Sequence, residues 1–205
     1  MIFTMTAESI STTLHKYAKA LSVVLGYRDL ITRFHSERVL ALSEATGLHC
    51  GLLTEELDIL RIGALLHDIG KIGTPDHILL KLSELDRTEW ETMKEHSEIG
   101  EKILLATELE GSRQAGLVVR HHHEHYNGQG YPDGRSGEAI PVQSRIVAIA
   151  DSYDAMAVTR AYSRARKHTE IMETLRDEAG GKHDPQLLRV FCEVIEHSAF
   201  KAPTV

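Results

Sequence analysis

The sequence is short of cysteine, aromatic residues and long apolar runs, and each shortage argues against a class of protein. Its two cysteines, Cys50 and Cys192, lie far apart with no CxxC spacing, so we expect free buried thiols and no disulfide scaffold. Residues 21–25 are too short an apolar stretch to cross a bilayer, and residues 1–6 lack the basic start of a signal peptide. Aromatic residues, at 5%, are too few to favour a β-sandwich. These shortages predict a helical protein of the reducing cytoplasm with no membrane partner.

Positive charge is also in deficit. The chain has 23 Lys and Arg against 30 Asp and Glu, a formal net charge of −7, which disfavours non-specific binding of nucleic acid through a basic face. Carboxylates that hold divalent cations count as negative in this sum, although bound cations would neutralise them. The residue present in excess is histidine, with 13 copies, and the clustering of these histidines decides what the excess means.

Apolar residues recur with helical periodicity along almost the whole chain, so the predicted fold class is all-α. The expected helices cover residues 9–26, 29–46, 54–67, 86–107, 112–123, 143–159, 169–179 and 185–198. Gly26 and Gly47 are the expected ends of the first two helices, and Thr54 is the expected N-cap of the third. Residues 69–78 contain two Gly and one Pro, which predicts a turn or loop.

Residues 124–141 are the one long stretch without periodicity. They contain four Gly and two Pro, and a structureless segment of this length inside a compact domain is usually functional. No repeat or linker divides the chain, whose length fits one domain or a domain and a half.

The pair His67-Asp68 ends an apolar helix, where two polar residues are costly unless something pairs with them. Adjacent His and Asp side chains point to neighbouring faces, so both can reach one cluster of cations, with the carboxylate bridging two of them. Lys71 follows four residues after His67 and could supply a positive charge for a phosphate. An HD dipeptide alone is weak support, because it occurs often by chance.

Further candidate ligands lie beside apolar helical faces, about one in each helix: His35, His96, the pair His122-His123, and Asp151. Imidazoles and carboxylates on converging helices are how helical bundles build di-metal sites. A set of nitrogen and oxygen ligands without thiolate suits iron, manganese, zinc, nickel or cobalt. Any one of these histidines is more often a hydrogen-bonded core or surface residue, but the set together predicts a metal centre.

The order of these motifs resembles the HD-GYP family, a branch of the HD phosphohydrolases. The matching segments are HSERV (35–39), LLHDIGKIGTPDHILLK (65–81), MKEH (93–96), HHEHYNGQGYP (122–132), IP (140–141), RIVAIADSYDAM (145–156) and TRAY (159–162). The resemblance implies an HD-type helical bundle with a C-terminal helical extension and a long loop, here called the GYP loop (residues 124–141). Residues 29–205 would form this domain, and residues 1–28 an N-terminal helix that packs on it or extends it.

The resemblance also implies an activity, hydrolysis of cyclic di-GMP to pGpG and GMP, and a role for each matching residue. One metal would be bound by His35, His67, Asp68 and Asp151, and a second by Asp68, His96, His122 and His123. A hydroxide activated between the two cations would attack phosphorus. Asp68, as bridging ligand, and Lys71 are the predicted catalytic residues. Lys71 and Arg160 match positions that contact phosphate, and Tyr131 and Arg164 are further candidate substrate contacts.

Four segments depart from the family pattern. Asn127-Gly128 replaces the family's DG in the long loop and keeps a turn former. Ile31 stands where some members have a Glu for a third metal, so we expect two metals. His125 replaces the usual Arg after HHE. Residues 160–163 replace RPY[KR] with RAYS, so that Ser163 removes a basic phosphate contact unless Arg164 substitutes for it. Losing one charge-assisted contact could cost about 1.5–3 kcal/mol of binding, which leaves weak or altered activity open.

The remaining histidines are expected to lie outside the metal centre. His121 adjoins the ligand pair, but the family register selects the two histidines that follow it. The others have no surrounding motif that needs an imidazole and are expected to be surface or structural residues: His15, His49, His77, His168, His183 and His197.

Three functions remain open at this point. The leading one is a cyclic di-GMP phosphodiesterase with two divalent metals, iron or manganese first and zinc, nickel or cobalt as alternatives. The second keeps the metals but acts on a mixed cyclic dinucleotide or a linear nucleotide. The third is a metal-loaded binding module with little turnover, which senses cyclic di-GMP or docks on a GGDEF-type partner through the GYP loop. The N-terminal helix either packs on the core or forms a homodimer contact.

Overall fold

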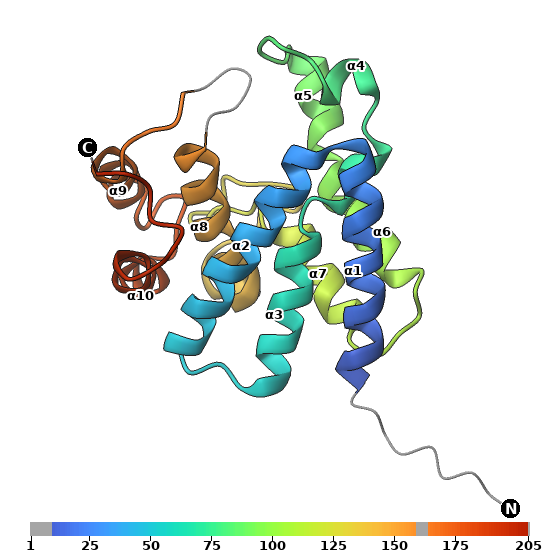
Figure 1. Ribbon diagram of the computed structural model, residues 1–205, viewed down its shortest axis with the longest axis horizontal. Helices are drawn as coiled ribbons and strands as arrows, with labels where there is room; N and C mark the ends of the chain where they lie inside the picture. The colour runs from blue at the N-terminus through green and yellow to red at the C-terminus, as the bar shows by residue number, and fades with distance from the viewer. Residues whose placement is uncertain (1–9, 159–163, 205) are drawn as a thin grey trace, which may run out of the picture.

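The computed structural model describes residues 10–158 and 164–204, and every regular element in these ranges is helical (Figure 1). The α-helices are α1 (Ile10–Arg28), α2 (Leu30–His49), α3 (Thr54–Leu66), α4 (Asp76–Leu79), α5 (Arg87–Lys94), α6 (His96–Leu105), α7 (Ser112–His121), α8 (Val142–Ala157), α9 (His168–Asp177) and α10 (Pro185–Glu196). Two short 3₁₀ helices, η1 (Ile69–Gly73) and η2 (Gly137–Ala139), interrupt the loops. The predicted all-α class is confirmed.

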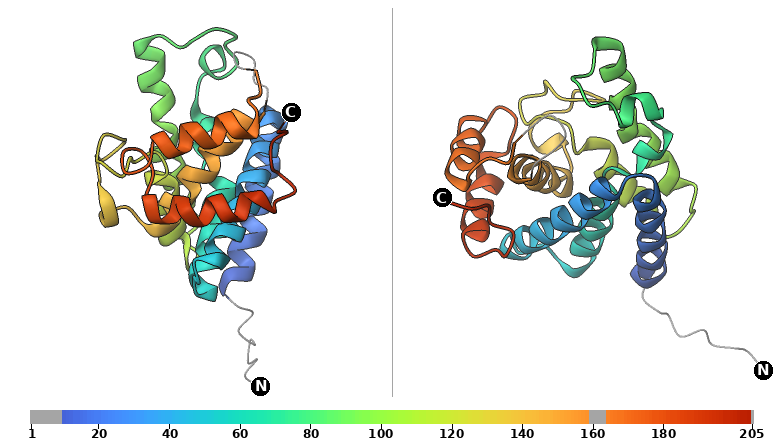
Figure 2. Two further views of the ribbon diagram at one scale, coloured as in Figure 1. Left: turned by 90° about the vertical axis from the view of Figure 1, so that its left-hand side faces the viewer. Right: turned by 45° about the horizontal axis from the view of Figure 1, so that its top comes forward.

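Helices α2, α3 and α8 form the centre of the bundle, and the other helices pack around them. Helix α1 lies against α2 and α3 on one side, while α9 and α10 lie on the opposite side against α8 and α2 (Figures 1 and 2). Helices α6 and α7 form a close pair, and η1 packs on α6. Short helices α4 and α5 project at one end of the bundle, as Figure 1 shows.

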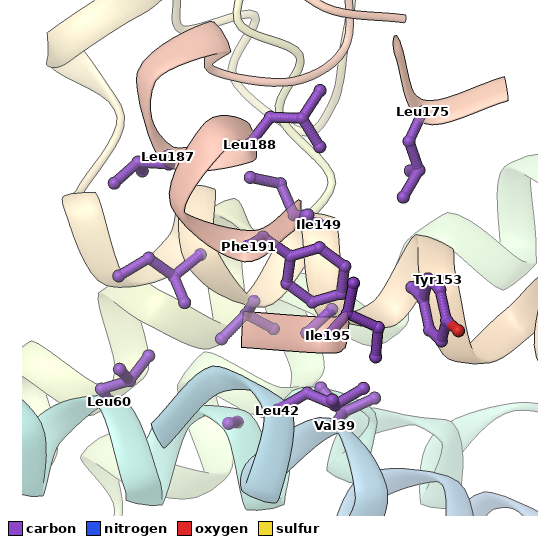
Figure 3. Close-up of a cluster of buried hydrophobic side chains, with 14 of the residues drawn as sticks. Val39, Leu42, Leu60, Ile149, Tyr153, Leu175, Leu187, Leu188, Phe191 and Ile195 are labelled. Atoms are coloured by element: carbon purple, nitrogen blue, oxygen red, sulfur yellow. The ribbon is translucent and has the colours of Figure 1, made fainter. Parts of the chain in front are cut away.

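Two apolar clusters hold these layers together. The first joins α2, α3, α8, α9 and α10 around fully buried Phe191 and Tyr153 (Figure 3). The second joins α1, α3, η1, α6 and α7, and it includes Leu66 and Leu104. Helix α3 contributes to both clusters, so its C-terminal end is fixed from two sides. That end carries the His67-Asp68 pair.

Helix α1 is part of this packing. Its residues Leu14, Ala18 and Leu25 are buried in the second cluster, against α3 and its neighbours. No helix in the described ranges is long and apolar enough to span a membrane.

The end of α2 corrects one prediction. The helix does not stop at Gly47 but continues to His49, and the chain turns only at Gly51, which has a φ of +73°. A Cβ at Gly47 would lie 2.6 Å from a methyl group of Leu60, so this glycine allows α2 to approach α3 closely. Gly47 therefore serves helix packing, the helix ends two residues later at His49, and the turn follows at Gly51.

Other boundaries also differ from the prediction. Helix α1 does not stop at Gly26 but continues to Arg28. Leu53 takes the N-cap position of α3 in place of Thr54, and its backbone N–H donates to the carboxylate of Glu56. The single helix expected over residues 86–107 is broken at Glu95 into α5 and α6. This break makes His96 the first residue of α6, where its side chain reaches the end of α3.

Candidate metal centre

The candidate ligands lie on or directly after five separate helices and converge at the end of α3. The ligand atoms of His35, His67 and Asp151 lie within 4.8 Å of one another, and the same holds for His96, His122 and His123. Rings of the two groups are in contact, since the His67 and His122 ring centroids are 5.1 Å apart. The structure thus places two adjoining groups of three ligands where the sequence predicts one two-metal centre.

Asp68 lies between the two groups and presents one oxygen to each. Its Oδ2 is 3.5 Å from Nε2 of His67 and 4.0 Å from Nε2 of His35. Its Oδ1 is 3.6 Å from Nε2 of His96. The side chain is only 3% exposed. This is the geometry that a carboxylate needs to bridge two cations.

Gly70 allows the two groups to come together. A Cβ at this position would lie 1.8 Å from the carbonyl oxygen of His96 and 2.7 Å from the backbone nitrogen of Gly100. Any side chain at position 70 would therefore push η1 away from α6. Because η1 follows Asp68 directly, the backbone contact at Gly70 sets the separation between Asp68 and His96.

Hydrogen bonds to backbone carbonyls orient three of the imidazoles. Nδ1 of His67 donates to Ala64 (2.8 Å), that of His96 to Met93 (2.7 Å), and that of His122 to Val119 (2.6 Å). A carbonyl oxygen can only accept, so each Nδ1 carries the proton and each Nε2 keeps its lone pair.

Nε2 of His67 shows that this arrangement fits a metal ion. The atom is buried and has no hydrogen-bond partner among the described residues. A buried polar atom without a partner is costly in a protein interior. The donor set around Nε2 of His67 is imidazole nitrogen and carboxylate oxygen, which suits a transition-metal ion. The residues present therefore fit the metals that the sequence predicts.

Burial and charge keep His96, His122 and the two carboxylate ligands in the protonation states that metals require. Burial lowers the pKa of His96 to about 4 and that of His122 to about 3, so both rings are neutral at pH 7. Burial opposes ionisation of Asp68, but Lys71 and the neighbouring imidazoles outweigh it and hold the pKa of this carboxyl well below its ordinary value. The pKa of Asp151 is also well below its ordinary value, because its contact with His35 outweighs the effect of burial.

His35 is held from two sides by carboxylates. Its Nε2 lies 2.9 Å from Asp151, and its Nδ1 lies 2.6 Å from Asp154. Arg38 donates two hydrogen bonds to Asp154, of 2.6 and 2.9 Å. Burial would lower the pKa of His35, but the two carboxylates outweigh burial and raise it. Sequence reasoning missed Asp154 and Arg38, although each follows a predicted ligand by three residues and so shares its helical face.

Lys71 lies beside the bridging carboxylate, with its Nζ 2.7 Å from Oδ2 of Asp68. The segment that carries it is the 3₁₀ helix η1, and not a continuation of α3. Arg28, the last residue of α1, fastens this segment by donating to the carbonyl oxygens of Lys71, Ile72 and Thr74. No motif or periodicity predicts this contact.

The GYP loop is anchored by buried residues beside the ligand pair. The carboxylate of Glu124 accepts backbone hydrogen bonds from Asp133 and Arg135 at 2.7 and 3.1 Å. His121 is fully buried and its Nε2 lies 2.9 Å from Asp133, so it points into the loop and away from the two groups. His121, Glu124 and Asp133 also have the spacing of a metal site. Their side chains are already used in the hydrogen bonds that anchor the loop.

Tyr131 of the GYP loop reaches the metal centre. Its ring stacks on that of His123, with centroids 4.8 Å apart and planes 29° apart. Burial raises the pKa of its hydroxyl above the ordinary value, so the phenol is neutral. Tyr131 therefore lies directly beside one of the two groups of candidate ligands.

The remaining predicted positions contribute no further ligand to the centre in the described part of the chain. Ile31 is 65% exposed and offers no ligand atom. Arg164 is exposed, and Arg160 and Ser163 lie outside the described residues. His125 is half-buried next to Lys182, where burial lowers its pKa. None of the six histidines predicted to be surface or structural belongs to a group of potential ligands in the described part of the chain: His15, His49, His77, His168, His183 and His197.

The fold and this centre define an all-helical protein with a histidine- and aspartate-rich site for metal ions. The sequence profile of the HD domain family matches residues 19–187. The chain therefore belongs to the HD domain family of metal-dependent proteins, and its resemblance to the HD-GYP branch is confirmed.

Individual relatives agree with this assignment. The cyclic di-GMP phosphodiesterase response regulator RpfG of Xanthomonas campestris is 38% identical over 174 residues, which cover 85% of this chain and 45% of RpfG. The 3'3'-cGAMP-specific phosphodiesterase 2 of Vibrio cholerae is 35% identical over 166 residues, which cover 81% of this chain and 32% of that protein. The chain thus spans less than half the length of these curated relatives.

A solved structure supports the fold independently. The structure of Bd1817, an HDGYP protein from Bdellovibrio bacteriovorus, matches with a TM-score of 0.65 at 19% identity. The match covers 93% of this chain and 65% of Bd1817.

Proposed function

We propose that this chain is a metal-dependent phosphodiesterase that hydrolyses cyclic di-GMP to pGpG or on to GMP. The observation that carries the proposal is the convergence of two groups of three ligands on the two oxygens of Asp68. The names of relatives such as RpfG support a cyclic dinucleotide as substrate. Within the chain, residues 29–205 would form the catalytic domain, and residues 1–28 its N-terminal helix.

The proposed centre holds two divalent cations. His35, His67 and Asp151 would hold one, His96, His122 and His123 the other, and Asp68 both. Iron or manganese is the first expectation, with zinc, nickel or cobalt as alternatives for the same donor set. When bound, such a pair supplies Lewis-acid stabilisation of the phosphate and lowers the pKa of water to the neutral range.

The protein's own groups would orient the substrate. Lys71, whose Nζ lies 2.7 Å from Asp68, is placed to donate to a phosphate oxygen that enters the centre. Tyr131 forms a wall of the site through its stacking on His123. Arg164 and Arg160 are proposed as further substrate contacts from the segment that follows α8.

The test joins metal analysis to a turnover assay. Protein loaded with manganese or iron is expected to convert cyclic di-GMP to pGpG or GMP. Asp68→Ala is expected to lose both metals and all turnover, because the same carboxylate serves each group. Asp58→Ala is the control, because it removes a partly buried carboxylate that pairs with Arg61 away from the centre. This variant should keep both metals and the wild-type turnover. If wild-type protein binds both metals but yields no product from any cyclic dinucleotide, the assignment as a phosphodiesterase is wrong.

A second candidate substrate is the mixed dinucleotide 3'3'-cGAMP, favoured by the 35% identity to a Vibrio cholerae enzyme that is named for it. Steady-state kcat/KM values on cyclic di-GMP, 3'3'-cGAMP and linear pGpG would rank the three. A preference of tenfold or more for 3'3'-cGAMP would replace the first assignment.

A binding module with little turnover is the other class of function. It would be favoured if metal-loaded protein bound cyclic di-GMP without hydrolysing it, or captured a GGDEF-type domain through the GYP loop.

A homodimer contact through α1 and a cytoplasmic location complete the proposal. Size measurement by light scattering would test the dimer.

A further inference from the structure

A line of aromatic rings runs from the metal centre to the surface. The rings of His122 and His123 have centroids 3.9 Å apart, and His123 stacks on Tyr131 at 4.8 Å. Tyr131 in turn meets the indole of Trp90 at 6.5 Å, with planes 81° apart. Trp90, the single tryptophan of the chain, is therefore two ring-to-ring steps from a predicted metal ligand.

Trp90 is not a core residue. Its side chain is 48% exposed, whereas Phe191 and Tyr153 of the first apolar cluster are fully buried. It lies on α5, a helix in which no residue is buried. The helix is held by its own cap, in which Asp86 accepts from Glu89 N and Glu89 accepts from Asp86 N. A large aromatic ring that leaves half its surface in water is available for a ligand.

The surroundings of Trp90 suit one part of a nucleotide. Lys94 follows four residues later on the same face of α5, and its Nζ lies 5.6 Å from the centre of the Tyr131 ring. Lys94 also pairs with the exposed carboxylate of Glu91 at 2.6 Å. Trp90 and Lys94 thus place an aromatic plane and an ammonium group next to the proposed phosphate-binding centre. Aromatic side chains bind nucleobases by stacking, and cations nearby attract the phosphates.

We propose that Trp90 is a base-stacking residue of this site, which binds one nucleobase of a cyclic dinucleotide whose phosphate lies at the metals. The inference rests on the proposed function and adds a substrate-binding residue to it. Every base has a π-face, so stacking on an indole tolerates guanine and adenine alike. Trp90 then raises affinity for cyclic di-GMP and 3'3'-cGAMP equally, and discrimination between them comes from elsewhere.

The single tryptophan supplies a direct test. Cyclic di-GMP added to protein loaded with a divalent metal should quench the Trp90 fluorescence saturably. Ribose 5-phosphate and inorganic phosphate, which carry no base, should not quench it. A saturable quench by ribose 5-phosphate of the same size would contradict stacking, and so would tight binding of cyclic di-GMP without any change in fluorescence.

Substitution separates stacking from a structural role. Trp90→Ala should raise KM and Kd for cyclic di-GMP about tenfold or more while kcat, metal content and inhibition by inorganic phosphate change little. Trp90→Phe, which keeps a ring, should recover most of the affinity. Phe200→Ala removes another half-exposed ring beyond α10 and is the matched control, expected to behave as wild type.

The outcomes distinguish this inference from the proposed function. If wild type hydrolyses cyclic di-GMP and Trp90→Ala does so with the same KM, the stacking role is wrong and the phosphodiesterase stands. A fall in kcat and metal content at unchanged KM would also overturn stacking, because it would assign Trp90 to the scaffold of α5. If wild type neither binds nor hydrolyses any cyclic dinucleotide, both are wrong.

Discussion

Asp154 holds His35 in the orientation that its place in the metal centre requires. The two side chains meet at 2.6 Å through Nδ1 and Oδ2, and they come from helices α2 and α8. The pKa of Asp154 is below its ordinary value, because its bonds to His35 and Arg38 outweigh burial, so the carboxylate is ionised and accepts. His35 therefore presents Nε2 to the cluster, the arrangement by which outer carboxylates orient metal-ligating histidines.

Asp154→Asn should weaken metal binding without removing a ligand. We expect a 10- to 100-fold lower affinity for manganese, of the size typical for the loss of an outer-shell partner, measured by competition with a chelator. The unfolding free energy should fall by about 1–3 kcal/mol, because the paired guanidinium of Arg38 loses a charged acceptor. Asp58→Asn, which alters a carboxylate outside the centre, is the control. Equal metal affinity in Asp154→Asn and wild type would contradict the role.

The stability of the metal-free protein should fall in weak acid. The folded pKa values of His96 and His122 are about 4 and about 3, whereas an unfolded histidine titrates near 6.5. Between pH 6.5 and 4 the unfolded chain binds protons that the folded chain excludes, so the unfolding free energy decreases as the pH falls. From pH 6.5 to 5.5 each of the two rings should remove roughly 1 kcal/mol, and the raised pKa of His35 offsets part of this.

Urea unfolding of metal-free protein at pH 7.5, 6.5 and 5.5 measures this dependence. His96→Asn removes one of the titrating rings, so its stability should change less with pH than that of wild type. A wild-type unfolding free energy that stays constant or rises on acidification would show that the imidazoles are not buried as neutral groups.

The metal centre was more predictable from sequence than the way it is held. Ligand motifs are local, so His67-Asp68 and His122-His123 could be read directly, and family register separated His121 from its neighbours. The supporting residues depend on contacts between distant segments. Arg28 reaches η1 across 43 positions, and no periodicity reports such a contact.

Glycines were the ambiguous signal in the prediction of the fold. Gly47 read as the end of a helix but permits the close packing of α2 on α3, while Gly51 makes the turn. The helix break at Glu95 contains neither Gly nor Pro, so the local sequence does not predict it. Both outcomes follow from tertiary packing, which overrides local propensity.

Gly70→Ala should disrupt the centre through one methyl group. The new Cβ would fall 1.8 Å from the His96 carbonyl, so η1 must move away from α6. We expect a loss of more than about 3 kcal/mol in unfolding free energy, with loss of metal in any protein that folds. Gly116→Ala in α7 is the matched control, since its Cβ would meet nothing closer than 3.4 Å. It should be neutral or stabilising because alanine favours helix. Denaturant midpoints of the two variants give the comparison.

Arg28→Ala should slow turnover more than it reduces metal content. The substitution removes the donors to the carbonyls of Lys71, Ile72 and Thr74, which leaves the segment after Asp68 less fixed, and we expect a loss of about 1–3 kcal/mol in stability. Asp76→Ala removes only the ion pair of Arg28 with a 75% exposed side chain and should cost little. If Asp76→Ala reproduced the loss of activity, the carbonyl contacts would not be its cause.

Arg28 also gives α1 a mechanical connection to the centre. The guanidinium at the end of this helix joins the backbone of η1, and η1 carries the lysine that pairs with Asp68. A displacement of α1 would therefore reach Asp68 through the side chain of Arg28 and the backbone of η1. The position of α1 and the position of the carboxylate between the two groups of ligands are therefore coupled through Arg28 and through Lys71, whose Nζ lies 2.7 Å from Asp68.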